Sequence, residues 1–257
     1  LTMSFWEETR KRIGEWPVER FHECPEVRST FLVGNAPYVA EHELPFILNS
    51  PRVKKWLSAL VEEGHVNIER FPELPCTTAN TLHQAYHLEH FLQFLGEHVH
   101  DANIEDFGDI VEFGAGYGAV YKLFMEMGYD GWYQIFDFPE MHAIQKFYLQ
   151  NYISRNIEWR HDNEIEFLTD YSCVRDSYCL IAFWSLSESP LVVRELILSK
   201  HYHQYAIGFQ DSFEGTNNLE YFTGFSKTLE SKGYRTLIKP YPHLPGNYYF
   251  FAVKVHT

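Results

Sequence analysis

Cysteine is scarce in this chain of 257 residues, which contains four: Cys24, Cys76, Cys173 and Cys179. No two of them have the CxxC spacing of a zinc knuckle or a redox pair, and four are few for a disulfide-stabilised chain of this length. We therefore expect reduced, mostly buried thiols.

Long apolar runs are also missing. No stretch approaches the roughly 20 consecutive apolar residues that a helix needs to cross a bilayer. The first residues do not show the basic-then-apolar pattern of a signal peptide either. We expect a cytoplasmic protein with no membrane partner.

Positive charge is in short supply: 21 Lys and Arg stand against 35 Asp and Glu, a formal net charge of −14. Such a surface repels phosphate backbones. The densest basic stretch, Arg10-Lys11-Arg12, is flanked by Glu7, Glu8 and Glu15 and is interpreted as a solvated helix face. We predict no nucleic-acid partner.

Apolar and aromatic residues are abundant, at 45% and 17% of the chain. This composition indicates a globular protein with a sizeable core and aromatic material for lining a pocket. The length favours one large domain, or one domain with a substantial cap.

From about residue 105 onward, short β-rich runs alternate with helical patterns, which is typical of a parallel sheet covered by helices. Five runs precede or separate the helical stretches, at 109–113, 132–137, 156–161, 177–184 and 204–210. Two further runs, 234–241 and 247–255, are joined by a short loop and must be antiparallel. The pattern predicts an α/β fold with a Rossmann-like seven-stranded sheet of five parallel β-α units and a C-terminal antiparallel hairpin.

Residues 1–100 differ in character, being punctuated by proline, rich in aromatics and biased toward helix. We predict that they form a helical N-terminal cap and that residues 101–257 form the ligand-binding domain.

The first strand of that domain runs into Gly114-Ala115-Gly116-Tyr117-Gly118, and a helical pattern starts at Ala119. In an open α/β sheet, glycines in the first β-α turn let the backbone approach a ligand closely. The stretch also fits GxGxxA, so a dinucleotide fingerprint stays open. Glu112 favours a ligand that carries a cationic group over a pyrophosphate.

The pattern ExGxGxG at the end of a first strand resembles motif I of the class I S-adenosylmethionine-dependent methyltransferases. The resemblance implies S-adenosylmethionine as the cofactor, bound at Glu112, Gly114, Ala115, Gly116 and Gly118. It also implies a seven-stranded sheet that ends in a β-hairpin.

Three further positions are candidates for binding this cofactor. Asp137 follows the second strand, where a carboxylate can accept hydrogen bonds from both ribose hydroxyls, a role shared with nicotinamide-binding folds. Phe138 would stack beside the adenine, or is a core aromatic. Asp162 resembles the carboxylate that reaches the adenine amino group, or is a helix N-cap.

A narrower resemblance is carried by VEFGAGYG, DFPE, QKFYL and SLSES, which together are similar to motifs of the sugar O-methyltransferase family of bacteria and large viruses. It covers roughly residues 75–257, with a partial match at SLSES because Leu186 replaces an aromatic. It implies methyl transfer to a hydroxyl of a sugar or glycoside, with a small-molecule or oligosaccharide acceptor.

Such a transfer needs a group that takes the hydroxyl proton. His243 is our first choice, because an imidazole with a pKa of about 6.5 suits base catalysis at neutral pH. Asp211 is the second, as base or as the residue that orients His243. Glu188 is a third candidate, or caps the helix that begins near Pro190. Trp184 forms an apolar wall beside the methyl group, or belongs to the core.

We expect no metal in the site, although Asp211 and Glu214 offer two oxygen ligands for a divalent cation. His83, His87 and His90 share a helix face, but no third-ligand pattern for zinc follows. Three alternatives stay open: O-methylation of a phenol or carboxylate, an NAD(P)-dependent oxidoreductase, and a binding protein without turnover. The sequence leaves the oligomeric state undetermined.

Overall fold

The computed structural model describes residues 5–30, 37–62, 71–99, 103–104, 107–152 and 165–255. The chain forms two compact units. The first contains Leu1–Glu89, Gly116–Gly128 and Asp137–Arg160, and the second contains His90–Ala115, Tyr129–Phe136 and His161–Thr257.

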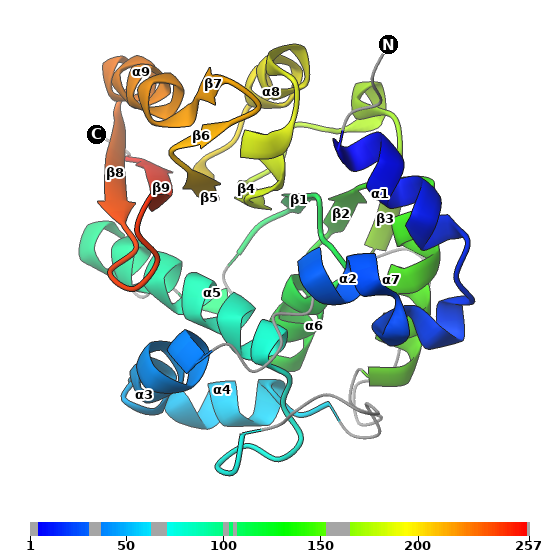
Figure 1. Ribbon diagram of the computed structural model, residues 1–257. Helices are drawn as coiled ribbons and strands as arrows, with labels where there is room; N and C mark the ends of the chain where they lie inside the picture. The colour runs from blue at the N-terminus through cyan, green and yellow to red at the C-terminus, as the bar shows by residue number, and fades with distance from the viewer. Residues whose placement is uncertain are drawn as a thin grey trace. The chain divides into compact units, whose positions relative to one another are not determined.

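The second unit is built on one seven-stranded sheet (Figure 1). Its strands are β1 (Ile110–Phe113), β2 (Tyr133–Phe136), β3 (Ile165–Leu168), β4 (Cys179–Phe183), β5 (Gln204–Gln210), β8 (Tyr234–Pro240) and β9 (Asn247–Lys254). They lie in the order β3-β2-β1-β4-β5-β9-β8; the first five are parallel, and β9 is antiparallel to both β5 and β8. The predicted fold, five parallel strands followed by an antiparallel hairpin, is confirmed.

The third strand of the sheet, β3, lies outside the run that we predicted for it. We predicted it over 156–161, and those residues lie outside the described part of the chain. The strand that pairs with β2 is β3, in which Ile165 lies opposite Tyr133 and Leu168 opposite Phe136. The other six predicted runs each contain a strand of the sheet.

One face of the sheet packs against α8 (Leu191–Leu198) and α9 (Asn218–Ser231). Alternate strand residues point to this face. They form a core cluster with Ile197 of α8 and with Phe222 and Leu229 of α9. The strand members of the cluster include Val111, Phe113, Leu180, Ala182, Ile207, Phe209, Phe250 and Ala252.

The opposite face packs against the second half of α5 (Ala79–His98). The rings of Phe91 and Phe94 lie 5.4 and 5.6 Å from that of Phe251, and the ring of His90 lies 5.3 Å from that of Tyr249. Because helices cover both faces, the central strands are buried on both sides and appear in the sequence as continuous apolar runs.

The second unit also contains shorter elements. These are a two-stranded hairpin of β6 (Ser212–Phe213) and β7 (Thr216–Asn217), and the 3-10 turns η4 (Tyr171–Cys173) and η5 (Ser185–Glu188). The hairpin follows β5 directly and leads into α9, whereas η5 follows β4. Both therefore lie at carboxyl ends of parallel strands.

The first unit is helical. Its elements are α1 (Phe5–Gly14), η1 (Val18–Glu23), α2 (Pro25–Thr30), η2 (Val39–Glu43), α3 (Leu44–Leu48), α4 (Val53–Ala59), the first half of α5, α6 (Ala119–Glu126) and α7 (Pro139–Tyr152). Thus helices from beyond residue 100 join those of the N-terminal region in one unit. The assignment of 1–100 as a cap and 101–257 as a domain stays a prediction.

Two further expectations concern composition. All four cysteines are free; Cys24 and Cys179 are buried, Cys76 is half-buried and Cys173 is exposed. No helix in the part of the chain that the structure describes is long and apolar enough to cross a membrane.

Candidate functional site

The glycine turn begins in the second unit, where β1 ends. The Gly114 N–H donates to the carbonyl of Phe136 at the end of β2, at 2.8 Å. Gly114 has a φ of +70°, and a Cβ on it would lie 2.3 Å from the Cβ of Ser185. The Ser185 hydroxyl donates to the carbonyl of Phe113. Close packing of the loop after β4 against the end of β1 therefore requires glycine here, whether or not a ligand binds.

The same turn continues in the first unit with Gly116 and Gly118, whose φ values are +57° and +99°. Gly118 is the N-cap of α6. All three glycines of the motif thus adopt the left-handed conformation that side chains disfavour. The backbone conformation therefore favours glycine at each of the three alternating positions.

Tyr117 anchors the middle of the turn within the first unit. Its ring is 1% exposed, and its hydroxyl lies 3.4 Å from Oγ1 of Thr78 and 3.5 Å from Oγ1 of Thr81. Thr78 precedes α5 and accepts a hydrogen bond from the N–H of Thr81 at 3.1 Å, as an N-cap does. The start of a 20-residue helix therefore supports the turn.

Glu112, on β1, is buried at 3% exposure. Its Oε2 accepts a hydrogen bond of 2.7 Å from the hydroxyl of Tyr133 on β2. Burial and the neighbouring carboxylate both raise the pKa of Tyr133 well above its usual range, so this hydroxyl stays a neutral donor. The predicted interaction of Glu112 with a cationic ligand group stays a proposal.

Asp137 follows β2 and belongs to the first unit. Its Oδ1 accepts the N–H of Phe138 at 2.8 Å, and its Oδ2 accepts Nε2 of Gln145 at 2.9 Å. The same Gln145 nitrogen donates to the carbonyl of Gly116 at 2.8 Å. Sequence reasoning did not single out Gln145; its only signal was its place in the QKFYL stretch of α7.

Phe138 lies against the N-terminal helix α1 of the first unit. The guanidinium carbon of Arg10 lies 4.9 Å from the centre of the Phe138 ring, and the ring of Trp6 lies 6.4 Å away. Arg10 also pairs with Glu140 at 3.3 Å. One face of the predicted adenine-stacking ring thus makes a cation–π contact.

Trp184 follows β4 with a φ of +65°, a strained value for a residue other than glycine. Its N–H donates to the carbonyl of Gly208 at 2.7 Å, and its indole Nε1 donates to Oδ1 of Asn247 at 2.9 Å. Such strain costs on the order of 1–3 kcal/mol and is concentrated at functional positions. The indole is half-buried, and its role as an apolar wall beside the methyl group stays a prediction.

Glu188 ends η5 and is half-buried. Its Oε1 accepts Nε2 of Gln210 at 3.1 Å, and Gln210 in turn accepts the hydroxyl of Ser187 at 3.0 Å. Pro190 is the N-cap of α8 and makes no side-chain capping bond, and the alternative role of Glu188 as a cap of this helix stays a prediction. Through Gln210, Glu188 links the ends of β4 and β5.

His243 lies half-buried in the loop between β8 and β9. Its ring is 6.1 Å from that of Tyr241, which stacks on Tyr249 at 4.0 Å. Asp211 is exposed after β5, and its N–H donates to the carbonyl of Gly246 in the same loop at 2.7 Å. Orientation of His243 by the Asp211 carboxylate stays a prediction, as does the choice between them as base.

The remaining predicted residues concern adenine and metals. Asp162 lies outside the described residues. Nδ1 of His83 lies 2.8 and 2.9 Å from the two oxygens of the buried Glu43, and its ring is 4.0 Å from that of His87. Across the described ranges, no group of three or more His, Cys, Asp or Glu side chains could hold a metal ion.

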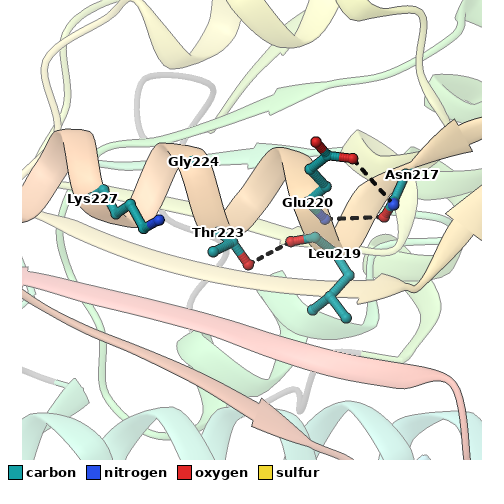
Figure 2. A pocket seen from close by; sticks show the side chains of 6 residues that line it. All are labelled: Asn217, Leu219, Glu220, Thr223, Gly224 and Lys227. Carbon is teal, nitrogen blue, oxygen red and sulfur yellow. Dashed lines mark hydrogen bonds between the residues drawn. The ribbon is translucent and has the colours of Figure 1, made fainter.

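Two hollows lie in the second unit beside β6, β7 and α9. One, of about 510 Å³, is lined by Asp211–Asn217 and Leu219 and so includes the exposed Asp211. The other, of about 480 Å³, runs along α9 from Asn217 to Lys227 (Figure 2). There Asn217 Oδ1 accepts the N–H of Glu220 at 3.0 Å, and its Nδ2 donates to the Glu220 carboxylate at 3.3 Å. These bonds are those of a helix cap, and none of the predicted site residues lines this second hollow.

No protein-family model and no curated protein sequence matches the chain, so the narrower resemblance to sugar O-methyltransferases receives no support from these comparisons. Similar solved structures include several methyltransferases. The magnesium protoporphyrin IX methyltransferase (ChlM) of Synechocystis PCC 6803 with bound SAM is 12% identical, over 82% of this chain and 95% of that one, with a TM-score of 0.45.

Two others are a fibrillarin/Nop5p complex and the precorrin-6y C5,15-methyltransferase of Geobacter metallireducens GS-15. The first is 11% identical over 74% of this chain and 90% of that one, with a TM-score of 0.47. The second is 12% identical over 58% and 82%, with a TM-score of 0.39.

Proposed function

We propose that the chain is an S-adenosylmethionine-dependent O-methyltransferase that acts on a hydroxyl of a sugar or glycoside. The observation that carries the proposal is the glycine turn after β1, with a positive φ at Gly114, Gly116 and Gly118. It follows the first strand of a parallel sheet, the place where such folds bind nucleotide-like ligands. Glu112, two residues before the turn, favours a cationic ligand.

The donor and acceptor groups present suit this cofactor. Asp137 accepts the Phe138 N–H on Oδ1 and the Gln145 amide on Oδ2, and its carboxylate is proposed to accept the ribose hydroxyls of the cofactor as well. Glu112 would bind the ammonium group, Phe138 would lie beside the adenine, and Asp162 would reach its amino group. Trp184 would lie beside the methyl group. When bound, the cofactor supplies an electrophilic methyl group.

The chain itself must orient the acceptor hydroxyl and take its proton. His243 is proposed as this base, with Asp211 as the second candidate or as its orienting partner, and Glu188 as the third. All three follow strands at the carboxyl edge of the sheet within the second unit. Glu188 is already engaged by Gln210, which makes it the weakest of the three.

The sugar acceptor rests on the motif resemblance and on the aromatic side chains of this edge. The half-buried Trp184 lies 5.6 Å from Tyr241, and flat aromatic surfaces suit the apolar faces of sugars. They would serve a phenol equally well, so a non-sugar acceptor is the second candidate. An NAD(P)-dependent oxidoreductase has only the GxGxxA spacing in its favour.

Titration calorimetry with S-adenosylmethionine and S-adenosylhomocysteine, with and without magnesium, tests the proposal. Micromolar binding of both is expected, unchanged by magnesium. A panel of sugars, phenols and carboxylates with radiolabelled methyl donor then identifies the acceptor class. No binding of either compound to folded protein, together with binding of NAD(P)H, would replace the proposal with the oxidoreductase reading.

A further inference from the structure

Gln145 of α7 has no exposed surface and connects two parts of the proposed cofactor site within the first unit. Its Nε2 donates to the carbonyl of Gly116 at 2.8 Å and to Oδ2 of Asp137 at 2.9 Å. Its Oε1 lies 2.9 Å from Nδ1 of His142, one turn earlier on the same helix. One buried amide thus holds the second glycine of the turn and the carboxylate after β2.

The chemistry of these partners fixes the amide in one orientation. The Gly116 carbonyl and the Asp137 carboxylate only accept hydrogen bonds, so both must face the NH₂ group of Gln145. Its two N–H bonds are then both used. The carbonyl oxygen faces His142, whose Nδ1 must carry a hydrogen to donate to it. Reversing the amide would place its oxygen against two groups that only accept, so the contacts with Gly116 and Asp137 would both be lost.

The geometry points to Gln145 as the positioning residue of the cofactor site, which directs the Asp137 carboxylate toward the ribose hydroxyls and fixes the conformation at Gly116. This inference rests on the proposed function. Asp137 is held from two sides, by the Phe138 N–H on Oδ1 and by Gln145 on Oδ2. The rotation of a carboxylate held in this way is restricted before the ligand arrives, which lowers the entropic cost of binding.

The test uses Gln145→Glu, which keeps the shape of the side chain but places an oxygen against two acceptors. We expect its affinity for S-adenosylhomocysteine to fall at least 10-fold. Gln150→Glu is the matched control, because it makes the same charge change at an exposed position of the same helix and should leave the affinity unchanged. Thermal unfolding of each variant shows whether the fold is retained.

A second ligand distinguishes a positioning role of Gln145 from a merely structural one. This ligand is the 2′-deoxyribose analogue of S-adenosylhomocysteine, and its affinity is measured in the same way. If Gln145 acts through Asp137, Gln145→Glu weakens the natural compound more than the analogue, so the preference of the wild type for the 2′-hydroxyl shrinks. Equal loss for both ligands, or no loss for either, would overturn the inference. Should Gln145→Glu not fold, His142→Ala removes the donor to Gln145 Oε1 without touching the Gln145 amide itself, and a smaller loss of the same preference is expected.

The proposed function and the positioning role of Gln145 can be refuted separately. If the wild type binds neither S-adenosylmethionine nor S-adenosylhomocysteine, the proposed function falls, and the inference falls with it. If the wild type binds both and Gln145→Glu binds both with unchanged affinity and unchanged ribose preference, only the role of Gln145 is refuted.

Discussion

The glycines of the turn have positive φ values, and a glycine with a positive φ outside the proposed site allows the effect on ligand binding to be measured apart from the effect on stability. Gly116→Ala introduces a side chain at a φ of +57°, and Gly215→Ala does so at +83° in open space between β6 and β7. Each should cost about 1–2 kcal/mol of stability. Only Gly116→Ala should weaken S-adenosylhomocysteine binding, measured by calorimetry. Equal affinities of the two variants would remove the turn from the site.

His243 is tested by replacement with alanine. If it is the base, turnover should fall by roughly 100-fold or more, while affinity for S-adenosylhomocysteine is retained. His201→Ala, an exposed histidine that precedes β5, is the matched control and should leave turnover unchanged. Near-normal turnover of His243→Ala in the methyl-transfer assay would assign the role to Asp211 or Glu188.

At the residue scale, the sequence indicated candidate site positions but not the residues that support them in the fold. Gly114, Gly116 and Asp137 became candidates because strand, turn and acidic residue follow in a fixed order along the chain. Gln145 and the Ser185 contact were missed, because both depend on tertiary packing. The pairing of His83 with Glu43 joins residues 40 apart, so the histidine face alone could not reveal its partner.

Among the elements, the loop after β4 and the end of β1 depend on each other. Gly114→Ala should destabilise the fold by about 2–4 kcal/mol, because it adds backbone strain at positive φ to a clash with the Cβ of Ser185. Adding Ser185→Gly removes the clash but not the strain. We therefore expect Gly114→Ala to lower the free energy of unfolding, measured with urea, by less in the Ser185→Gly background than in the wild type. Strict additivity would contradict the packing argument.

The start of α5 is a second such element. Thr78→Ala removes the N-cap acceptor and a polar contact of Tyr117, and should lower the free energy of unfolding by about 1–2 kcal/mol. Thr78→Ser keeps the hydroxyl and should restore most of this loss. If serine and alanine behave alike in urea unfolding, the methyl group rather than the cap is what stabilises the helix.

The sequence predicted helices and strands well where the spacing of apolar residues and the residues of the connecting loops indicated the same element. The hairpin of β8 and β9 followed from two β-rich runs joined by a short loop, which leaves no room for a parallel crossover. The run that forms β3 was missed because IEFL, at 165–168, places Glu166 within a four-residue strand. The role of Glu188 as a cap of α8 stays a prediction, because helix start signals identify a boundary but not which side chain folds back on it.

For the whole molecule, the fold class could be predicted because a sheet covered on both faces leaves a signature from about residue 105 onward: buried strands as apolar runs, with helical patterns between them. The grouping into two compact units could not, since the first unit combines N-terminal residues with 116–128 and 137–160. Sequence order does not encode that association. Contacts such as that of Arg10 with Glu140, 130 residues apart, create it.

Buried tyrosines give the whole molecule a predictable response to alkali. Burial raises the pKa of Tyr133 and Tyr148 well above the usual 10, and their carboxylate partners Glu112 and Glu62 raise it further. Burial also raises the pKa of Tyr38 to about 12. Above pH 10 the unfolded chain loses tyrosine protons that the folded chain keeps. The free energy of unfolding should therefore fall as the pH rises, by up to about 1.4 kcal/mol per pH unit for each such tyrosine.

Lys122 acts in the opposite direction over a lower range, because burial lowers its pKa. Between that lowered value and 10.5, the unfolded state binds the extra proton, so stability rises with pH until the tyrosine contribution takes over. Urea unfolding at a series of pH values from 8 to 11 should show a maximum followed by a steep decline. Tyr133→Phe should flatten the decline, whereas Tyr171→Phe, at an exposed tyrosine, should not. A decline of unchanged slope in Tyr133→Phe would mean that its hydroxyl is not held protonated by the fold.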